Sequence, residues 1–156
     1  MGILLYSLSN PELKSTADPR RSHWKLRLSK PLILCVDDEE LGLRVRKMVL
    51  ESAGYRVLTG IDGAAGLSIF ANEPVSAVVL DYYMPGMNGG EVAAEMRRLR
   101  PDVPIILLSA YINLPAEVIR LVDCTIVKGD GPEMLLTKVQ EMLPRDAGSI
   151  DGEVRG

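Results

Sequence analysis

From residue 31 onward, short apolar segments alternate with amphipathic segments of helical period. The apolar segments are rich in Val, Ile and Leu and show little polar alternation, which is typical of strands buried on both faces of a sheet. They are Leu32–Val36, Tyr55–Thr59, Val75–Leu80, Ile105–Leu108 and Thr125–Val127. Strands that alternate with helices in this way predict a doubly wound α/β fold, with a five-stranded parallel sheet and helices on both faces.

The helices between the strands are predicted from apolar residues three and four positions apart. The predicted stripes consist of Leu41, Val45, Met48 and Val49; of Leu67, Phe70 and Ala71; of Val92, Met96 and Leu99; and of Leu135, Val139, Met142 and Leu143. Asn88 followed three residues later by Glu91 predicts a capping box, and Asp62 predicts a second N-cap. Gly54 is expected to end the first helix.

Composition divides the chain into three parts. Residues 1–30 contain several Ser and Pro residues without a sustained period, and we interpret them as an irregular basic extension. Residues 31–143 form the predicted domain, and residues 144–156 a flexible tail.

Charge and hydropathy limit the classes of function. Residues 1–31 carry six Lys or Arg against two Asp or Glu, whereas residues 32–156 carry twelve against nineteen. An acidic body argues against direct binding of nucleic acid, whose phosphates attract a basic surface. The sequence contains no apolar segment of membrane-spanning length and no convincing signal peptide, so we expect a cytoplasmic protein.

Both cysteines fall in apolar, strand-like segments and have no CxxC or other metal-binding spacing. We therefore expect Cys35 and Cys124 to be reduced residues of the core.

Polar groups follow four of the five predicted strands, at the point where each strand ends. They are Asp37 and Asp38, Asp81, Ser109 and Lys128. Sites in this class of fold lie beyond the carboxyl ends of the strands, so we expect these groups to converge. Clustered carboxylates repel unless a cation lies among them, and Mg²⁺ prefers such oxygens. An Asp can also attack phosphorus, while Lys and Ser stabilise the charge of the transferred group.

Two strings and two further positions of the sequence resemble the response regulator receiver family of two-component signalling. The string CVDDE of residues 35–39 is similar to the family's acidic pair, and DYYMPGMNG of residues 81–89 closely resembles its phosphoacceptor loop. Ser109-Ala110 and Lys128 match its hydroxyl and lysine positions. The resemblance covers roughly residues 31–143 and implies a flavodoxin-like strand order of 2-1-3-4-5.

For the metal, the resemblance implies that Asp38 and Asp81 ligate Mg²⁺ together with the backbone carbonyl of Tyr83. Asp37 is expected to act mostly through water. No other cofactor is implied.

For signalling, the resemblance implies a stand-alone receiver that is not an enzyme in its own right. A sensor histidine kinase or a histidine phosphotransfer protein would phosphorylate Asp81, and Ser109 and Lys128 would contact the phosphoryl oxygens. The signal would pass to a downstream protein effector through a change of the face formed by the helix expected at Ala116–Val122, the strand Thr125–Val127 and the last helix. The oligomeric state does not follow from the sequence.

Three departures from the family pattern fall on the side that reads the signal out. Thr125 stands where an aromatic residue is common, and Gly129 stands where Pro usually follows the lysine. Pro115 limits the helix before the last strand to about two turns, which we expect at Ala116–Val122. Tyr111 either replaces the missing aromatic or packs on the surface, and the sequence supports both interpretations equally.

Two other classes of function compete with this interpretation. A phosphohydrolase of the haloacid-dehalogenase type needs a second Asp two residues after the nucleophile, but Tyr83 follows Asp81 and Glu39 follows Asp37 at that spacing. A flavodoxin-like binding or scaffold domain, or a receiver that works without phosphate, remains the main alternative.

Overall fold

The structure, a computed structural model, describes residues 30–144. A five-stranded parallel sheet with the strand order β2-β1-β3-β4-β5 forms its centre. The strands are β1 (Leu32–Val36), β2 (Arg56–Gly60), β3 (Ala77–Asp81), β4 (Ile105–Ser109) and β5 (Cys124–Val127). The predicted fold class and the strand order implied by the resemblance are therefore both confirmed.

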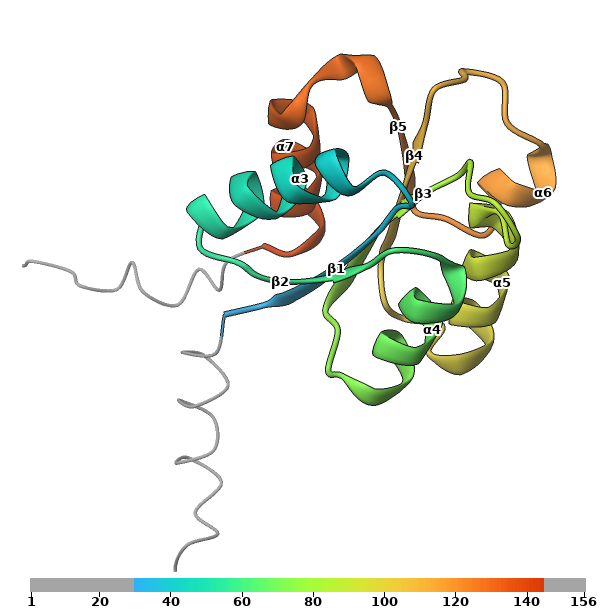
Figure 1. Cartoon of the computed structure of the whole chain (residues 1–156), viewed down its shortest axis with the longest axis horizontal. Helices are drawn as coiled ribbons and strands as arrows, with labels where there is room; N and C mark the ends of the chain where they lie inside the picture. Colours follow the sequence, from blue (N-terminus) through green and yellow to red (C-terminus); the bar gives the residue numbers. More distant parts are fainter. Residues whose placement is uncertain (1–29, 145–156) are drawn as a thin grey trace, which may run out of the picture. The chain divides into compact units, whose positions relative to one another are not determined.

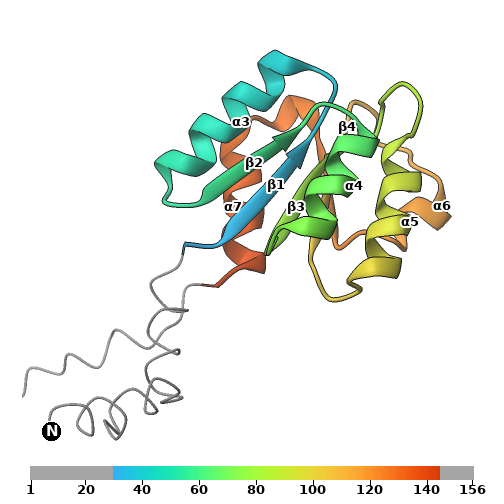
Figure 2. The ribbon, with the colours of Figure 1, turned by 60° about the horizontal axis from the view of Figure 1, so that its bottom comes forward.

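Helices cover both faces of the sheet (Figures 1 and 2). They are α3 (Glu40–Ser52), α4 (Gly63–Asn72), α5 (Gly89–Leu99), α6 (Ala116–Ile119) and α7 (Pro132–Met142), with the 3₁₀ turn η2 (Lys128–Asp130) before the last helix. Helices α3 and α7 lie together on one face, whereas α4, α5 and α6 lie on the other.

Two apolar cores result, one on each face of the sheet. In β1, Leu34 packs into the core beneath α4 and α5, while its neighbours Ile33 and Cys35 pack into the core beneath α3 and α7. Successive side chains of a strand point to opposite faces, so a strand covered on both faces is apolar at every position. This explains why the strand segments show no polar alternation in the sequence.

Local polar contacts fix where two helices begin, as predicted. The Asn88 side chain accepts a hydrogen bond from the Glu91 backbone N–H at 3.0 Å, and the Glu91 carboxylate accepts from the Asn88 backbone N–H at 2.8 Å. The Asp62 side chain accepts from the backbone N–H of Ala65 at 2.7 Å and caps α4. Gly54 follows the end of α3 with a φ of 97°, a conformation that favours glycine.

The predicted inward stripe of α3 is wrong. Leu41 and Met48 are 67% and 62% exposed, whereas Leu43 and Leu50 are buried against the sheet. Both sets have the spacing of one helix face, because α3 carries apolar residues on two opposite sides. Contact with the sheet selects the side that contains Leu43 and Leu50.

Helix α6 is shorter than the predicted Ala116–Val122 and ends at Ile119. The Arg97 side chain of α5 explains this early end, because its Nε donates to the carbonyl of Leu121 at 2.7 Å and its guanidinium pairs with Asp123. Asp123 also accepts from the backbone N–H of Ile105 at 2.8 Å, so the chain turns directly into β5.

Three further residues are more exposed than predicted. Ala71 and Leu99 lie at the solvent side of α4 and α5. Cys124 is only partly buried because it lies on the edge strand β5, whereas Cys35 is fully buried. Both cysteines are free, and strands β3 and β4 lie between the strands that carry them.

Within residues 30–144, none of the helices has the length and apolarity needed to cross a membrane. The expected basic extension and the expected tail lie outside the described residues, apart from Lys30 and Pro144.

Candidate functional site

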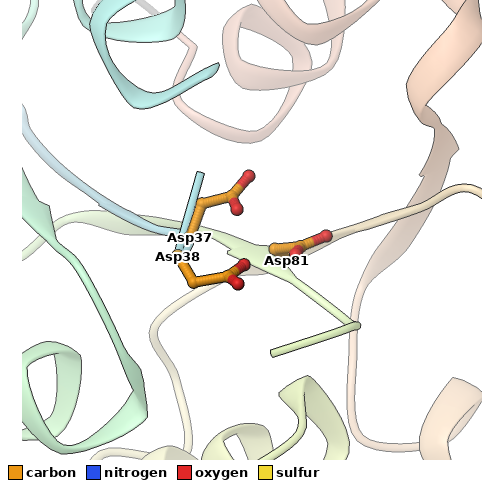
Figure 3. A group of neighbouring side chains, drawn as sticks. All are labelled: Asp37, Asp38 and Asp81. Carbon is orange, nitrogen blue, oxygen red and sulfur yellow. The ribbon is translucent and has the colours of Figure 1, made fainter. Parts of the chain in front are cut away.

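The carboxyl ends of β1 and β3 bring three carboxylates together (Figure 3). Asp37 and Asp38 follow β1, and Asp81 is the last residue of β3 rather than the first residue beyond it. One carboxylate oxygen from each residue lies within 4.8 Å of the others. Asp37 and Asp81 are buried, and Asp38 is exposed. The cluster predicted from the strand ends therefore exists, open to solvent on the side of Asp38.

Lys128 links the buried carboxylates. Its Nζ lies 3.0 Å from Oδ1 of Asp81 and 3.3 Å from Oδ2 of Asp37. The lysine follows β5 directly, and because β1, β3, β4 and β5 are parallel it lies at the same edge of the sheet as the ends of β1 and β3. Burial opposes its charge, but the hydrogen bond to Asp81 and the two negative charges raise the pKa of Lys128 above its ordinary value. Lys128 is therefore a firmly charged ammonium.

Asp37 is the most strongly bound of the three carboxylates. Its Oδ1 accepts from the backbone N–H of Glu39 at 2.9 Å, and its Oδ2 accepts from Arg46 as well as from Lys128. Burial favours the neutral acid, but these three donors outweigh it and hold the pKa of Asp37 below its ordinary value. Asp37 is thus ionised and already paired.

Asp81 has the opposite electrostatic balance. Burial raises the pKa of Asp81 to about 6. The hydrogen bond from Lys128 offsets this effect only in part, and the negative charge of Asp37 adds to it. At neutral pH the carboxylate is ionised, but it is poorly compensated. Such a group has both a nucleophilic oxygen and a reason to attract further positive charge.

Ser109 is buried at the end of β4, where it pairs in register with Val127, the residue before Lys128. Its Oγ accepts a hydrogen bond from the backbone N–H of Tyr111 at 3.0 Å. The hydroxyl proton is therefore free of that contact and can be donated elsewhere. The Tyr111 ring is 63% exposed, which favours the surface interpretation for this residue.

The loop after Asp81 is held closely against the start of α5. The backbone N–H of Gly89 donates to the carbonyl of Tyr82 at 2.7 Å. A Cβ atom at position 89 would lie only 2.5 Å from the Asp81 carbonyl oxygen, so a side chain here would displace the loop. Tyr83, in the same loop, is 75% exposed.

Two of the departures from the family pattern, at Thr125 and Gly129, can be located in the structure. Thr125 is exposed on β5, the edge strand beside β4. Gly129 lies in η2 without a positive φ, and the positive φ of this turn falls on Gly131 at 85°. The positive φ of this turn therefore lies just before α7 and not directly after Lys128.

Sequence reasoning missed Arg46. It lies on α3 between the buried Leu43 and Leu50, and the wrong choice of the inward stripe concealed it. The signal was present, because Leu43, Arg46 and Leu50 follow the spacing of one helix face.

The raised pKa of Asp81 predicts that the stability of the metal-free protein depends on pH. The folded protein retains a proton on Asp81 up to about pH 6, whereas the unfolded chain releases it near the ordinary value of 3.8. Ionisation of Asp81 therefore destabilises the fold increasingly as the pH rises from 3.8 through 6. In EDTA at about pH 7.5, Asp81→Asn should raise the melting temperature by a few degrees, or about 1–2 kcal/mol.

Thermal unfolding followed by circular dichroism tests this expectation at about pH 7.5 and about pH 5, where the gain should fall to about half. Asp102→Asn, at an exposed position in the turn after α5, is the matched control. An equal gain at both pH values would show that the charge of Asp81 is not the cause.

Comparisons with known proteins agree with this geometry. The family model of the response regulator receiver domain matches residues 33–140. A probable transcriptional regulator, ycf27, of Porphyridium aerugineum is 36% identical over 121 residues, which cover 76% of this chain and 50% of the relative. The YkoG regulator of Bacillus subtilis is 38% identical over 91 residues, which cover 58% of this chain and 40% of the relative. The chain thus spans about half the length, or less, of these curated relatives.

Solved structures show the same likeness. A CheY-like receiver domain of Methanospirillum hungatei has a TM-score of 0.69 and 31% identity, covering 74% of this chain and 94% of that one. The response regulator TrrA of Thermotoga maritima, in complex with Mg²⁺-BeF, has a TM-score of 0.68 and 34% identity, covering 72% of this chain and 98% of that one.

Proposed function

This chain belongs to the response regulator receiver domain family, and from that premise we propose that Asp81 accepts a phosphoryl group from a phosphohistidine donor. The observation that carries the proposal is the contact of Lys128 with Asp81, 3.0 Å apart, inside a cluster of three carboxylates. In the proposed step an oxygen of Asp81 bonds to phosphorus while the bond from phosphorus to the donor's imidazole nitrogen breaks.

The carboxylate cluster fits a magnesium ion. Direct ligands of an octahedral Mg²⁺ lie at most ~4.2 Å apart, so the oxygens of Asp38 and Asp81, within 4.8 Å of one another, need only small movements. Asp38 and Asp81 would hold the ion with the backbone carbonyl of Tyr83, and Asp37 would act through water. When bound, Mg²⁺ would supply positive charge to the oxygens of the transferred group.

Lys128 and Ser109 have complementary roles in the proposed reaction. Lys128 already contacts Asp81, and after phosphoryl transfer its ammonium would contact the negatively charged phosphoryl oxygens. The Ser109 hydroxyl, which accepts its hydrogen bond from Tyr111, would donate to one of those oxygens. The Ser109 contact would then change the conformation of the face around α6 and β5, and this change would transmit the signal.

A protein donor is supported by the exposed side of α3. Leu41, Val45 and Met48 form an exposed apolar stripe on the helix that starts two residues after Asp38. An apolar stripe beside the reactive carboxylates is suited to docking of a histidine kinase or a phosphotransfer protein. Such a donor would place the protein in the cytoplasm. We expect output through contact with a protein effector.

The experiment that tests the proposal is incubation with acetyl phosphate and Mg²⁺, followed by intact mass spectrometry. Addition of one phosphoryl group that requires Mg²⁺ supports the proposal. An unchanged mass, together with no binding of Mg²⁺ in calorimetry, favours the phosphate-independent alternative.

The two loop tyrosines predict a long-lived phosphorylated state. Tyr83 and Tyr111 each lie two residues beyond a site residue, and their large side chains should hinder the water that hydrolyses the acyl phosphate. The double variant Tyr83→Ser/Tyr111→Ser should lose its phosphoryl group about tenfold faster, equivalent to about 1.4 kcal/mol in the barrier. Decay of the phosphorylated mass after removal of acetyl phosphate measures this, with the exposed Ile112→Ser as control. An unchanged decay rate would refute it.

A further inference from the structure

Arg46 is a largely buried cation of α3 that pairs with one carboxylate of the acidic cluster. Its side chain is 14% exposed, and its guanidinium donates to Oδ2 of Asp37. Within the described part of the chain, Asp37 is the only side chain that accepts a hydrogen bond from Arg46. Burial of a guanidinium is costly unless it is paired, so this ion pair is a built contact rather than a chance meeting of surface groups.

Gly42 makes room for this contact. It lies one helical turn before Arg46, where a Cβ atom would be 3.1 Å from both terminal guanidinium nitrogens. Glycine inside a helix costs about 1 kcal/mol relative to alanine, so its presence here has a spatial reason. Gly42 and Arg46 therefore form one arrangement that lets the guanidinium lie along α3 toward Asp37.

The arrangement leaves Asp37 little capacity for a metal. Both of its oxygens accept hydrogen bonds, Oδ1 from the backbone N–H of Glu39 and Oδ2 from Arg46 and Lys128. Lys128 also contacts Asp81 and can transfer its interaction to a phosphoryl group. Among residues 30–144, no second carboxylate pairs with Arg46, so its positive charge stays beside Asp37 and opposes any cation that enters the cluster.

We propose that Arg46 is an internal counter-ion which neutralises Asp37 in the metal-free protein and weakens the binding of Mg²⁺ by the acidic cluster. This inference rests on the proposed magnesium site and adds the residue that sets its affinity. The receiver would consequently fold without metal, and its phosphorylation would depend on the magnesium concentration over a higher range than three unpaired carboxylates would need.

Removal of the positive charge of Arg46 should raise the affinity for Mg²⁺ and lower the stability of the metal-free protein. Arg46→Gln retains a donor for Asp37 but removes the positive charge, so Mg²⁺ should bind about tenfold more tightly. The same variant leaves the buried Asp37 with less compensation and should melt several degrees lower in EDTA. Saturating Mg²⁺ should restore most of that loss, because the ion replaces the missing charge.

The test combines calorimetric titration with MgCl₂ and thermal unfolding, in EDTA and in saturating Mg²⁺. Arg46→Lys retains the charge and should bind Mg²⁺ with nearly wild-type affinity. Gly42→Ala should displace the guanidinium by only a few tenths of an ångström and should change the affinity much less than Arg46→Gln does. Arg44→Gln, at an exposed position on the same helix, is the matched control and should leave the affinity unchanged.

The outcomes separate this inference from the proposed function. Measurable binding by wild type with the same affinity in Arg46→Gln, or an equal loss of stability with and without Mg²⁺, overturns the counter-ion role alone. Absence of binding in every variant overturns the magnesium site as well. Binding by Arg46→Gln but not by wild type supports the inference. Should Arg46→Gln not fold, Arg46→Met takes its place, because it also removes the charge, and unchanged affinity in that variant contradicts the inference.

Discussion

The Asp81→Asn variant should gain no phosphoryl group from acetyl phosphate and Mg²⁺, whereas the wild-type protein should gain one. An amide is a far weaker nucleophile than a carboxylate, and the substitution also removes a charge that would hold the metal. The two neighbouring carboxylates are poor replacements. Both oxygens of Asp37 already accept hydrogen bonds. Asp38 is exposed, and the close contact of Lys128, at 3.0 Å, is with Asp81.

Intact mass spectrometry after a fixed incubation measures this result, and Asp102→Asn is again the matched control. Phosphorylation of Asp81→Asn to the wild-type level would place the acceptor at another residue. Peptide mapping after reduction of the acyl phosphate would then identify it.

The second large effect is expected for Lys128→Met, which should slow phosphorylation of Asp81 by about 10²–10³-fold. The ammonium is the only Lys or Arg group within salt-bridge distance of Asp81 in the described residues, and its place at the end of β5 fixes it there. Its removal leaves no protein cation to meet the charge of the transferred group. The methionine side chain preserves most of the volume.

The initial rate of mass increase with acetyl phosphate measures this effect. Lys138→Met provides the control, since Lys138 is a lysine of α7 that pairs with Glu141 at 3.0 Å, away from the site. A rate for Lys128→Met close to that of the control would show that charge stabilisation at Asp81 comes from elsewhere.

The sequence was sufficient to predict most of the site. Asp37, Asp81, Ser109 and Lys128 lie at the carboxyl edge of the sheet because parallel strands end on the same side, whatever packs around them. Their roles in phosphoryl transfer remain predictions. Strand ends shifted by a residue, so that Asp81 and Ser109 belong to β3 and β4, without changing which edge they occupy.

Helix faces were harder to predict than strand ends. On α3 the residues Leu41 and Leu43 lie on nearly opposite sides, and each belongs to an apolar stripe of correct period. Periodicity shows which residues share one side of a helix, but it does not show which side faces the sheet. The same ambiguity hid Arg46, which lies on the inward side.

The sequence by itself determined the order of strands and helices, the caps at Asn88 and Asp62, and the set of polar residues at the strand ends, because these follow from local period and chain connectivity. Only the tertiary structure decided which side of α3 is buried, where α6 ends, and that Arg46 reaches Asp37 past Gly42. The buried side of α3 and the end of α6 depend on contacts between segments distant in sequence, whose free energy outweighs local preference, and Arg46 reaches Asp37 because it lies on the side of α3 that the sheet selects.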